Sequence, residues 1–175
     1  MREHFEWIRR LIGAILISSL VSGAAFAQPT NSPNTTKTNT IYTELATSVL
    51  TGSASLNYEH LLTHNFSIRL GYGFGYYGSA RGITTADGPL SMVYYSFSAS
   101  NSKAEIGLGG SLMNKRDGIP RSDISFLAGT GWRISPSIAL GYRYQQFEGG
   151  FFFRIGITYA YLFGGPIQIS LGHTF

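Results

Sequence analysis

The sequence predicts an all-β protein, an eight-stranded antiparallel transmembrane β-barrel, and three observations support this prediction. From residue 41 onward, large apolar residues alternate with small or polar ones along most of the chain. Charged residues make up only 13% of the chain, about half of the roughly 25% typical of soluble domains. The chain also stops on an aromatic residue at the end of an alternating segment, which suits a strand whose last ring lies at a lipid–water boundary.

The N-terminal region has the pattern of a secretory signal peptide. Arginines precede an apolar stretch over residues 11–21, and Ala25 and Ala27 provide the small residues of a cleavage site. We expect a signal peptide over 1–27, cleaved after Ala27. A retained membrane helix is the alternative, but the apolar stretch is short. Residues 28–40 are rich in Pro, Asn and Thr and have no apolar pattern, so they are predicted to form a disordered leader before a barrel over 41–175.

The clearest strand covers residues 66–76. Its even positions are all apolar or aromatic, whereas its odd positions are glycine, Ser67 and Arg69. Successive side chains of a strand point to opposite faces, so this pattern predicts one bulky face and one small, polar face. A transmembrane strand needs about 9–11 residues. An eight-stranded barrel has room inside only for side chains, so the bulky face is expected to meet lipid and the small face to line the lumen. A soluble lipocalin-like barrel, the alternative fold, would place its apolar faces inward.

Nine segments alternate in this way, whereas single-chain bacterial barrels have an even number of strands. Either 41–62 is one bulged strand, or 124–146 is one long strand that continues through Pro136. In the first region a hairpin at Thr51-Gly52 is expected, because the apolar residues lie at odd-numbered positions before it and at even-numbered positions after it. The second alternative is preferred. It puts short turns at 62–65, 98–102 and 147–150 on one side of the membrane and longer polar loops at 78–88 and 114–122 on the other, as outer-membrane barrels do.

Seven charged residues share the parity of the lumen face. They are Glu44, Glu59, Arg69, Glu105, Arg133, Arg143 and Arg154. Buried charges must pair with each other or with water, so a structural salt-bridge network that plugs the lumen is predicted. A narrow polar conduit is the functional alternative.

Two other groups of residues suggest contacts outside the barrel. Leu171, His173 and Phe175 in the last strand look like the C-terminal signature that bacterial outer-membrane barrels present to their assembly machinery. In the polar loop, Lys115, Arg116 and Arg121 are candidates for contacting lipopolysaccharide phosphates, although simple solvation of an exposed loop explains them as well.

No constellation in the sequence predicts catalysis, a metal or a cofactor. Cysteine is absent, so thiol catalysis and zinc-thiolate sites are excluded. His60, His64 and His173 have no Ser and carboxylate at a convincing spacing, so a lipid A-modifying enzyme is disfavoured. The net charge of +4 is small and its basic residues are scattered, so nucleic acid is not an expected partner.

Several stretches resemble a family of small outer-membrane β-barrel proteins found in Bacteroidetes and related bacteria. They are Y-T-E-L (42–45), S-L-N-Y-E (55–59), I-R-L-G-Y-G-F (68–74), A-E-I-G-L-G (104–109), L-G-Y-R-Y-Q (140–145), G-G-F-F-F-R-I-G-I-T (149–158) and the terminal S-L-G-H-T-F. His173 stands where the family usually has Tyr, and 122–138 looks expanded. The resemblance implies the barrel fold and an outer-membrane location, and it carries over no catalytic residue.

Together these observations predict a non-enzymatic, monomeric outer-membrane barrel of a Gram-negative bacterium with a structural or surface-interaction role and a plugged lumen. Its expected partners are outer-membrane lipid, lipopolysaccharide and the barrel-assembly machinery. The alternatives are a ligand-binding or adhesion module that works through loops 78–88 and 114–122, and, less favoured, a lipid A-modifying enzyme or a narrow pore.

Overall fold

The computed structural model describes residues 37–47, 51–79, 82–98, 100–116, 130–160 and 167–175. The predicted signal peptide, residues 28–36 of the predicted leader, and Arg121 lie outside these ranges. Among the described residues, no helix is long and apolar enough to cross a bilayer.

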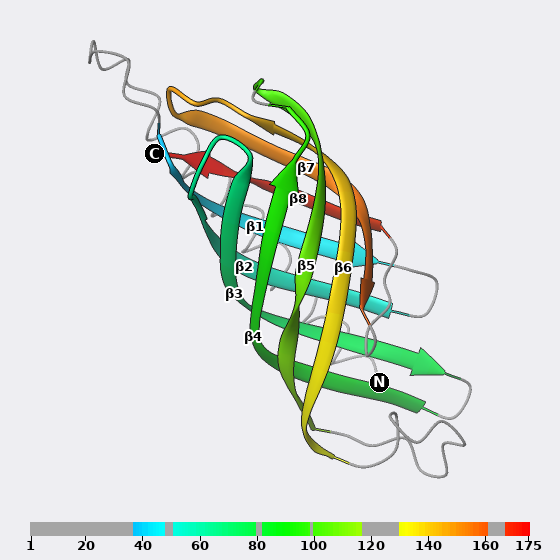
Figure 1. Cartoon of the computed structure of the whole chain (residues 1–175). Coiled ribbons are helices and arrows are strands. Elements are labelled where there is room, and N and C mark those ends of the chain that lie inside the picture. The colour runs from blue at the N-terminus through cyan, green and yellow to red at the C-terminus, as the bar shows by residue number, and fades with distance from the viewer. Residues whose placement is uncertain (1–36, 48–50, 80–81, 99, 117–129, 161–166) are drawn as a thin grey trace.

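The described residues form eight antiparallel strands that close into a single barrel, which confirms the predicted fold class. The strands are β1 (Asn39–Thr47), β2 (Thr51–Leu61), β3 (Phe66–Ser79), β4 (Gly82–Ser96), β5 (Ser102–Lys115), β6 (Gly131–Gln145), β7 (Gly150–Ala160) and β8 (Ile167–Thr174). Each strand pairs with the next in sequence, and β8 returns to pair with β1 (Figure 1). Closure pairs every strand with two neighbours along the main part of the wall, so no strand forms an open sheet edge over its whole length.

The first and last strands close the barrel from Thr40 opposite Thr174 to Thr47 opposite Ile167. The pairing continues for one more residue at the C-terminus, where the Phe175 N–H donates to Asn39 O at 2.8 Å and the Asn39 N–H donates to Phe175 O at 3.3 Å. We call this end of the barrel the terminal end and the opposite end the loop end.

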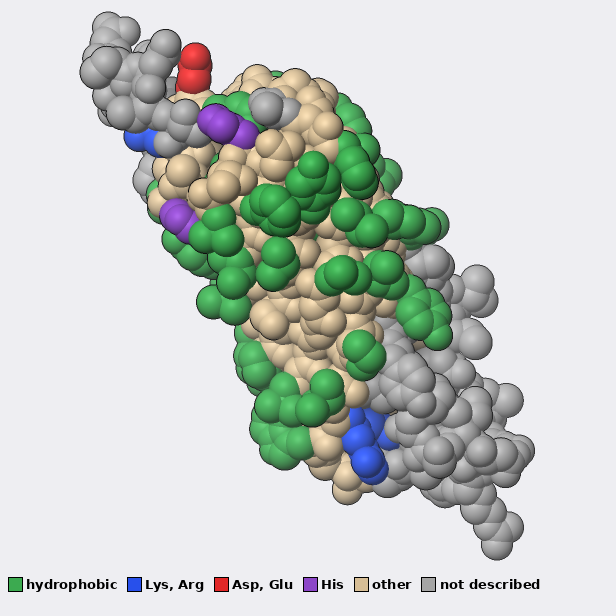
Figure 2. Space-filling model, viewed as in Figure 1, with side chains coloured by type: hydrophobic (Ala, Val, Ile, Leu, Met, Phe, Trp, Pro, Cys, Tyr) green, Lys and Arg blue, Asp and Glu red, His purple; other side chains and the backbone are tan. Residues whose placement is uncertain are grey.

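The two faces of the wall differ in chemistry. On β3 the even residues Phe66 to Tyr76 are exposed on the outside, while Ser67 and Arg69 are buried inside. The same division holds around the barrel, and most exposed large side chains are Ile, Leu, Phe and Tyr. Figure 2 shows hydrophobic side chains spread along the wall, with the visible charged side chains near its two ends. This is the opposite of a water-soluble barrel, so the soluble lipocalin-like alternative is wrong.

The structure supports the preferred choice for the two uncertain regions in the part that it describes. Residues 41–62 contain two strands, β1 and β2, whereas β6 runs unbroken from Gly131 through Pro136 to Gln145. Residues 124–129 of the predicted long strand lie outside the described residues. Pro136 lies opposite Gly110 of β5, and β7 pairs with β6 only from Ser137 onward. Proline is therefore placed where β6 has one partner strand among the described residues, a position at which its missing N–H is tolerated.

Three sequence-based boundaries need correction. The predicted hairpin at Thr51-Gly52 is misplaced, because both residues belong to β2 and Gly52 lies opposite Thr47. The predicted loop 78–88 is largely a continuation of β3 and β4, which remain paired as far as Ser79 and Gly82. The barrel begins at Asn39, two residues before the expected start.

The inner face is narrow enough to require glycine at Gly71. A Cβ atom at this position would overlap the Asn57 side chain and the Leu56 carbonyl on the neighbouring strand. Small inward residues on β3 therefore leave room for the long charged side chains that cross the lumen.

Candidate functional site

Six of the seven charged residues predicted to face the lumen are buried inside the barrel and form ion pairs. They are Glu44, Glu59, Glu105, Arg69, Arg143 and Arg154, and we call them the lumen charge cluster. They come from six of the eight strands. Three carboxylates therefore face three guanidinium groups, so the cluster is balanced in charge.

Glu59 lies at the centre of the cluster. Its carboxylate accepts hydrogen bonds from Arg143 Nη1 at 2.6 Å, Arg154 Nη2 at 2.9 Å, Ser67 Oγ at 2.6 Å and the Tyr42 hydroxyl at 3.0 Å. These donors approach from four different strands, which ties opposite sides of the barrel together. A buried carboxylate with this many donors is stable in its charged form because every lone pair direction is occupied.

Arg154 links Glu59 to the second carboxylate of the cluster. Its Nε and Nη2 donate to Glu105, and its Nη1 donates to the Tyr42 hydroxyl at 2.7 Å. Both Arg154 and Arg143 have no exposed surface, and Arg143 Nη1 lies 3.6 Å from Glu105 Oε2. Removing either arginine would leave a carboxylate buried with too few partners.

Glu44 and Arg69 form a separate, two-pronged pair nearer the loop end. Arg69 donates from Nη1 and Nη2 to the two carboxylate oxygens at 2.9 and 2.8 Å. Ser170 Oγ also donates to Glu44, while Arg69 donates from Nε to Asn57 and from Nη1 to the Tyr94 hydroxyl. The parallel geometry is the strong form of an arginine–carboxylate contact.

Aromatic rings fill the space around the guanidinium groups. Tyr42 and Phe152 stack with their ring centroids 4.7 Å apart, and the Arg154 Cζ lies 4.1 Å from the Tyr94 ring centroid. A guanidinium over a ring face is an attractive contact when it is desolvated. Rings and ion pairs together occupy the central part of the lumen, where Phe152, Arg143 and Arg154 are all without exposed surface.

These aromatic residues were missed in the sequence, together with two buried lysines. Tyr42 shares the parity of Glu44, and Lys103 and Lys115 share the parity of Glu105, so the alternation contained the signal. Lys103 Nζ donates to the His64 carbonyl at 3.2 Å and lies over the Phe147 ring at the terminal end. Lys115 is buried at the loop end of β5.

Arg133 does not join the lumen charge cluster. It has the expected parity, but it lies near the loop end of β6, opposite Met113, and its side chain is exposed. Arg133 lies on the same face of the wall as the other six residues, but it is nearer the loop end of the barrel axis.

The basic residues proposed to contact lipopolysaccharide are not presented together. Lys115 is buried, which corrects its assignment to an exposed loop, and Arg121 lies outside the described residues. Arg116 is exposed and pairs through Nε with Asp87 Oδ1 at 2.7 Å. Of the three, Arg116 remains a candidate for contact with a phosphate.

His60, His64 and His173, the histidines of the described residues, lie at the terminal end and do not converge on one another. His60 Nδ1 is 2.8 Å from Asn39 Oδ1, the His64 ring packs edge-on against Phe147, and His173 lies opposite Ile41 and Phe151. In the described part of the chain, no group of three His, Asp or Glu side chains is arranged to hold a metal ion.

A closed barrel with an apolar exterior and a charged, side-chain-filled interior defines a small membrane-spanning β-barrel. Two solved structures are similar to it. The outer membrane protein OprG from Pseudomonas aeruginosa has a TM-score of 0.45 and 10% identity over 79% of this chain and 93% of that chain. Ail, the attachment invasion locus protein of Yersinia pestis, solved in complex with the heparin analogue sucrose octasulfate, has a TM-score of 0.38 and 7% identity over 79% and 97%. No protein-family model and no curated protein matches the sequence.

Proposed function

We propose that the protein is a small integral barrel of the bacterial outer membrane, with a structural or surface-interaction role and a lumen closed by the lumen charge cluster. The observation that carries this proposal is that all six charged side chains of the cluster pair with each other across the barrel. A pore would need mobile or water-facing charges along a continuous path. Here the central side chains bind one another and have no exposed surface.

The location is supported by chemistry and by the sequence. Eight-stranded barrels with an apolar outer band are built for the outer membrane, and the predicted signal peptide would deliver the chain to the periplasm. Short connections at the terminal end, between β2 and β3, β4 and β5, and β6 and β7, fit a periplasmic position for that end.

We infer that the barrel does not act as an enzyme. His60 is engaged by Asn39, which also accepts a hydrogen bond from the Tyr58 hydroxyl at 2.6 Å. The buried carboxylates of the cluster are each committed to arginine, so none is placed to activate a nucleophile.

Purified protein in planar lipid bilayers is expected to show no stable unit conductance, because the cluster leaves no open path. A variant with Glu59, Glu105, Arg143 and Arg154 all replaced by alanine removes the four central charges in one step. If this variant folds, as judged by its migration on unboiled gels, it is expected to conduct ions. A stable, ion-selective conductance of the unaltered protein would contradict the closed lumen and favour the narrow-pore alternative.

Deleting Phe175 is expected to reduce the amount of assembled barrel several-fold while export to the periplasm continues. The deletion removes both the last backbone hydrogen-bond pair with Asn39 and the exposed terminal ring. Cell fractionation combined with unboiled gels would measure both quantities. The variant Phe175→Tyr keeps the ring and the backbone pair, so it should assemble normally. Normal assembly of the deletion variant would argue against a terminal assembly signal.

A further inference from the structure

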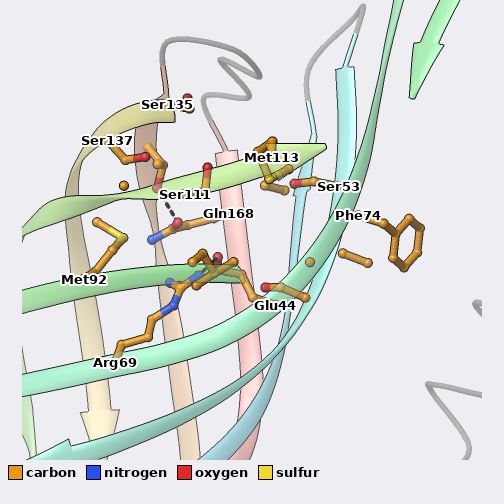
Figure 3. A pocket seen from close by; sticks show the side chains of 17 residues that line it. Glu44, Ser53, Arg69, Phe74, Met92, Ser111, Met113, Ser135, Ser137 and Gln168 are labelled. Carbon is orange, nitrogen blue, oxygen red and sulfur yellow. Dashed lines mark hydrogen bonds and ion pairs between the residues drawn. The ribbon is translucent and has the colours of Figure 1, made fainter. Parts of the chain in front are cut away.

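The loop-end half of the lumen contains a cavity of about 90 Å³ that the lumen charge cluster does not fill. Its wall includes Ser53, Ser111 and Ser137 on three different strands, with Met92 and Met113 between them, and the Glu44–Arg69 pair forms its floor (Figure 3). The cavity is not sealed on all sides. The Phe74 ring points away from it, to the outer face of the wall.

The wall combines free hydroxyl groups with apolar surface. The hydroxyls of Ser53, Ser111 and Ser137 have no hydrogen-bond partner among the described residues. Beside them, the thioether side chains of Met92 and Met113 are buried and offer apolar contact. An occupant that satisfies both kinds of surface carries neutral hydrogen-bonding groups on a short hydrocarbon frame. Hydroxyl groups fit this need because each can both donate and accept a hydrogen bond.

The floor of the cavity selects against a charged occupant. The Glu44 carboxylate already accepts hydrogen bonds from Arg69 and Ser170, and Arg69 also donates to Asn57 and Tyr94. The two charges therefore neutralise each other. A charged molecule that reaches this floor would lose its hydration without gaining an opposite charge from the Glu44–Arg69 pair.

Size sets a further limit. An engineered protein cavity of about 150 Å³ holds a benzene molecule, and one water molecule takes up about 30 Å³ of liquid. A cavity of about 90 Å³ with an open side suits a molecule about as large as a three-carbon polyol, or the end of a longer one.

We propose that this cavity is a binding site for a short neutral polyol, held by the serine hydroxyls and seated on the methionine side chains. The site lies above a floor that closes the lumen, so the polyol binds without crossing the membrane. This polyol site goes beyond the structural role proposed above.

The methionines provide the measurement. Two of the three methionines of the chain line the cavity, so the full chain labelled at its methionine methyl groups with ¹³C and placed in lipid nanodiscs reports directly on the site. Glycerol is expected to shift the Met92 and Met113 signals in a saturable way in the millimolar range. Glycine, a zwitterion of similar size, is expected to leave both signals unchanged.

Two matched variants separate binding from general solvent effects. Ser111→Leu fills the cavity and should abolish the saturable shift. Ser91→Leu makes the same change on the neighbouring strand but on the exposed outer face, next to Gly110, and should retain it. The absence of a saturable glycerol shift, an equal shift in Ser111→Leu, or an equal response to glycine would overturn the proposal. None of these outcomes depends on whether the lumen conducts ions.

Discussion

Replacing Arg154 with methionine is expected to lower the free energy of unfolding by about 3–5 kcal/mol, the usual cost of removing one partner of a buried ion pair. Arg154 donates to both Glu59 and Glu105 and has no exposed surface. The substitution keeps most of the side-chain volume but leaves two buried carboxylates with fewer donors. Urea unfolding in lipid vesicles, followed by the loss of the fast-migrating band on unboiled gels, would measure the change.

The control for this prediction is Arg116→Met. Arg116 also pairs with a carboxylate, Asp87, at 2.7 Å, but its side chain is two-thirds exposed. Exposed pairs contribute about 0–1 kcal/mol, so the control should be nearly neutral. A further variant, Glu105→Gln combined with Arg154→Met, removes one unpaired charge and should recover part of the loss. Equal costs for Arg154→Met and Arg116→Met would contradict the role assigned to the lumen charge cluster.

Replacing Leu70 with arginine is expected to destabilise the barrel by about 2–4 kcal/mol in lipid, the cost of a charge on the lipid face near the bilayer midplane. Leu70 is exposed and lies in the middle of the apolar face of β3, opposite Tyr58 and Ser91. In a water-soluble protein, an arginine at such an exposed position would cost almost nothing. Urea unfolding in vesicles would give the value.

Ile83→Arg is the matched control, because Ile83 is also exposed but lies near the tip of the β3–β4 hairpin. The penalty for a charge falls to about 0–1 kcal/mol near the interfaces. A larger destabilisation for Leu70→Arg than for Ile83→Arg would show that the cost of a charge depends on its depth in the bilayer. Similar small costs at both sites would place the outer face of β3 in water.

The alternation of apolar and small residues predicts most of the fold because the two faces of a strand such as β3 differ clearly in size and polarity. The bulky face of Phe66 to Tyr76 cannot fit inside eight strands, so parity alone assigns the inside and the outside. The same argument assigns Glu59, Arg143 and Arg154 to the lumen from their positions in the sequence. Pairing between them cannot be read from the sequence, because it depends on the register around the whole barrel.

Parity fails where both faces of a strand carry apolar residues. Over residues 90–97, Met92 and Tyr94 are as apolar as Val93 and Tyr95, so the sequence leaves the strand ambiguous. In the structure Tyr94 turns inward because its hydroxyl accepts a hydrogen bond from Arg69 and its ring lies beside Arg154. A polar handle on an aromatic side chain makes it suitable for a charged interior.

Parity also says nothing about height along the barrel. Arg133 and Arg143 share one face of β6, yet Arg133 is exposed near the loop end and Arg143 is fully buried. Residues 78–88 resemble a loop in sequence because they lack an alternating apolar face, which leaves them with the polar composition typical of loops. In the structure, β3 and β4 nevertheless remain paired there, for example at Gly78 opposite Ile83.

The central claim, that the outer face of this barrel meets lipid, has a direct test because the chain contains no cysteine. Single cysteines at the even positions 66 to 76 can carry nitroxide spin labels in lipid vesicles, with Ser67 as the inward control. We expect high collision rates with lipid-soluble oxygen at the even positions, highest near Leu70, and low rates with a water-soluble relaxing agent. High rates with the water-soluble agent along the whole even face would contradict a transmembrane barrel.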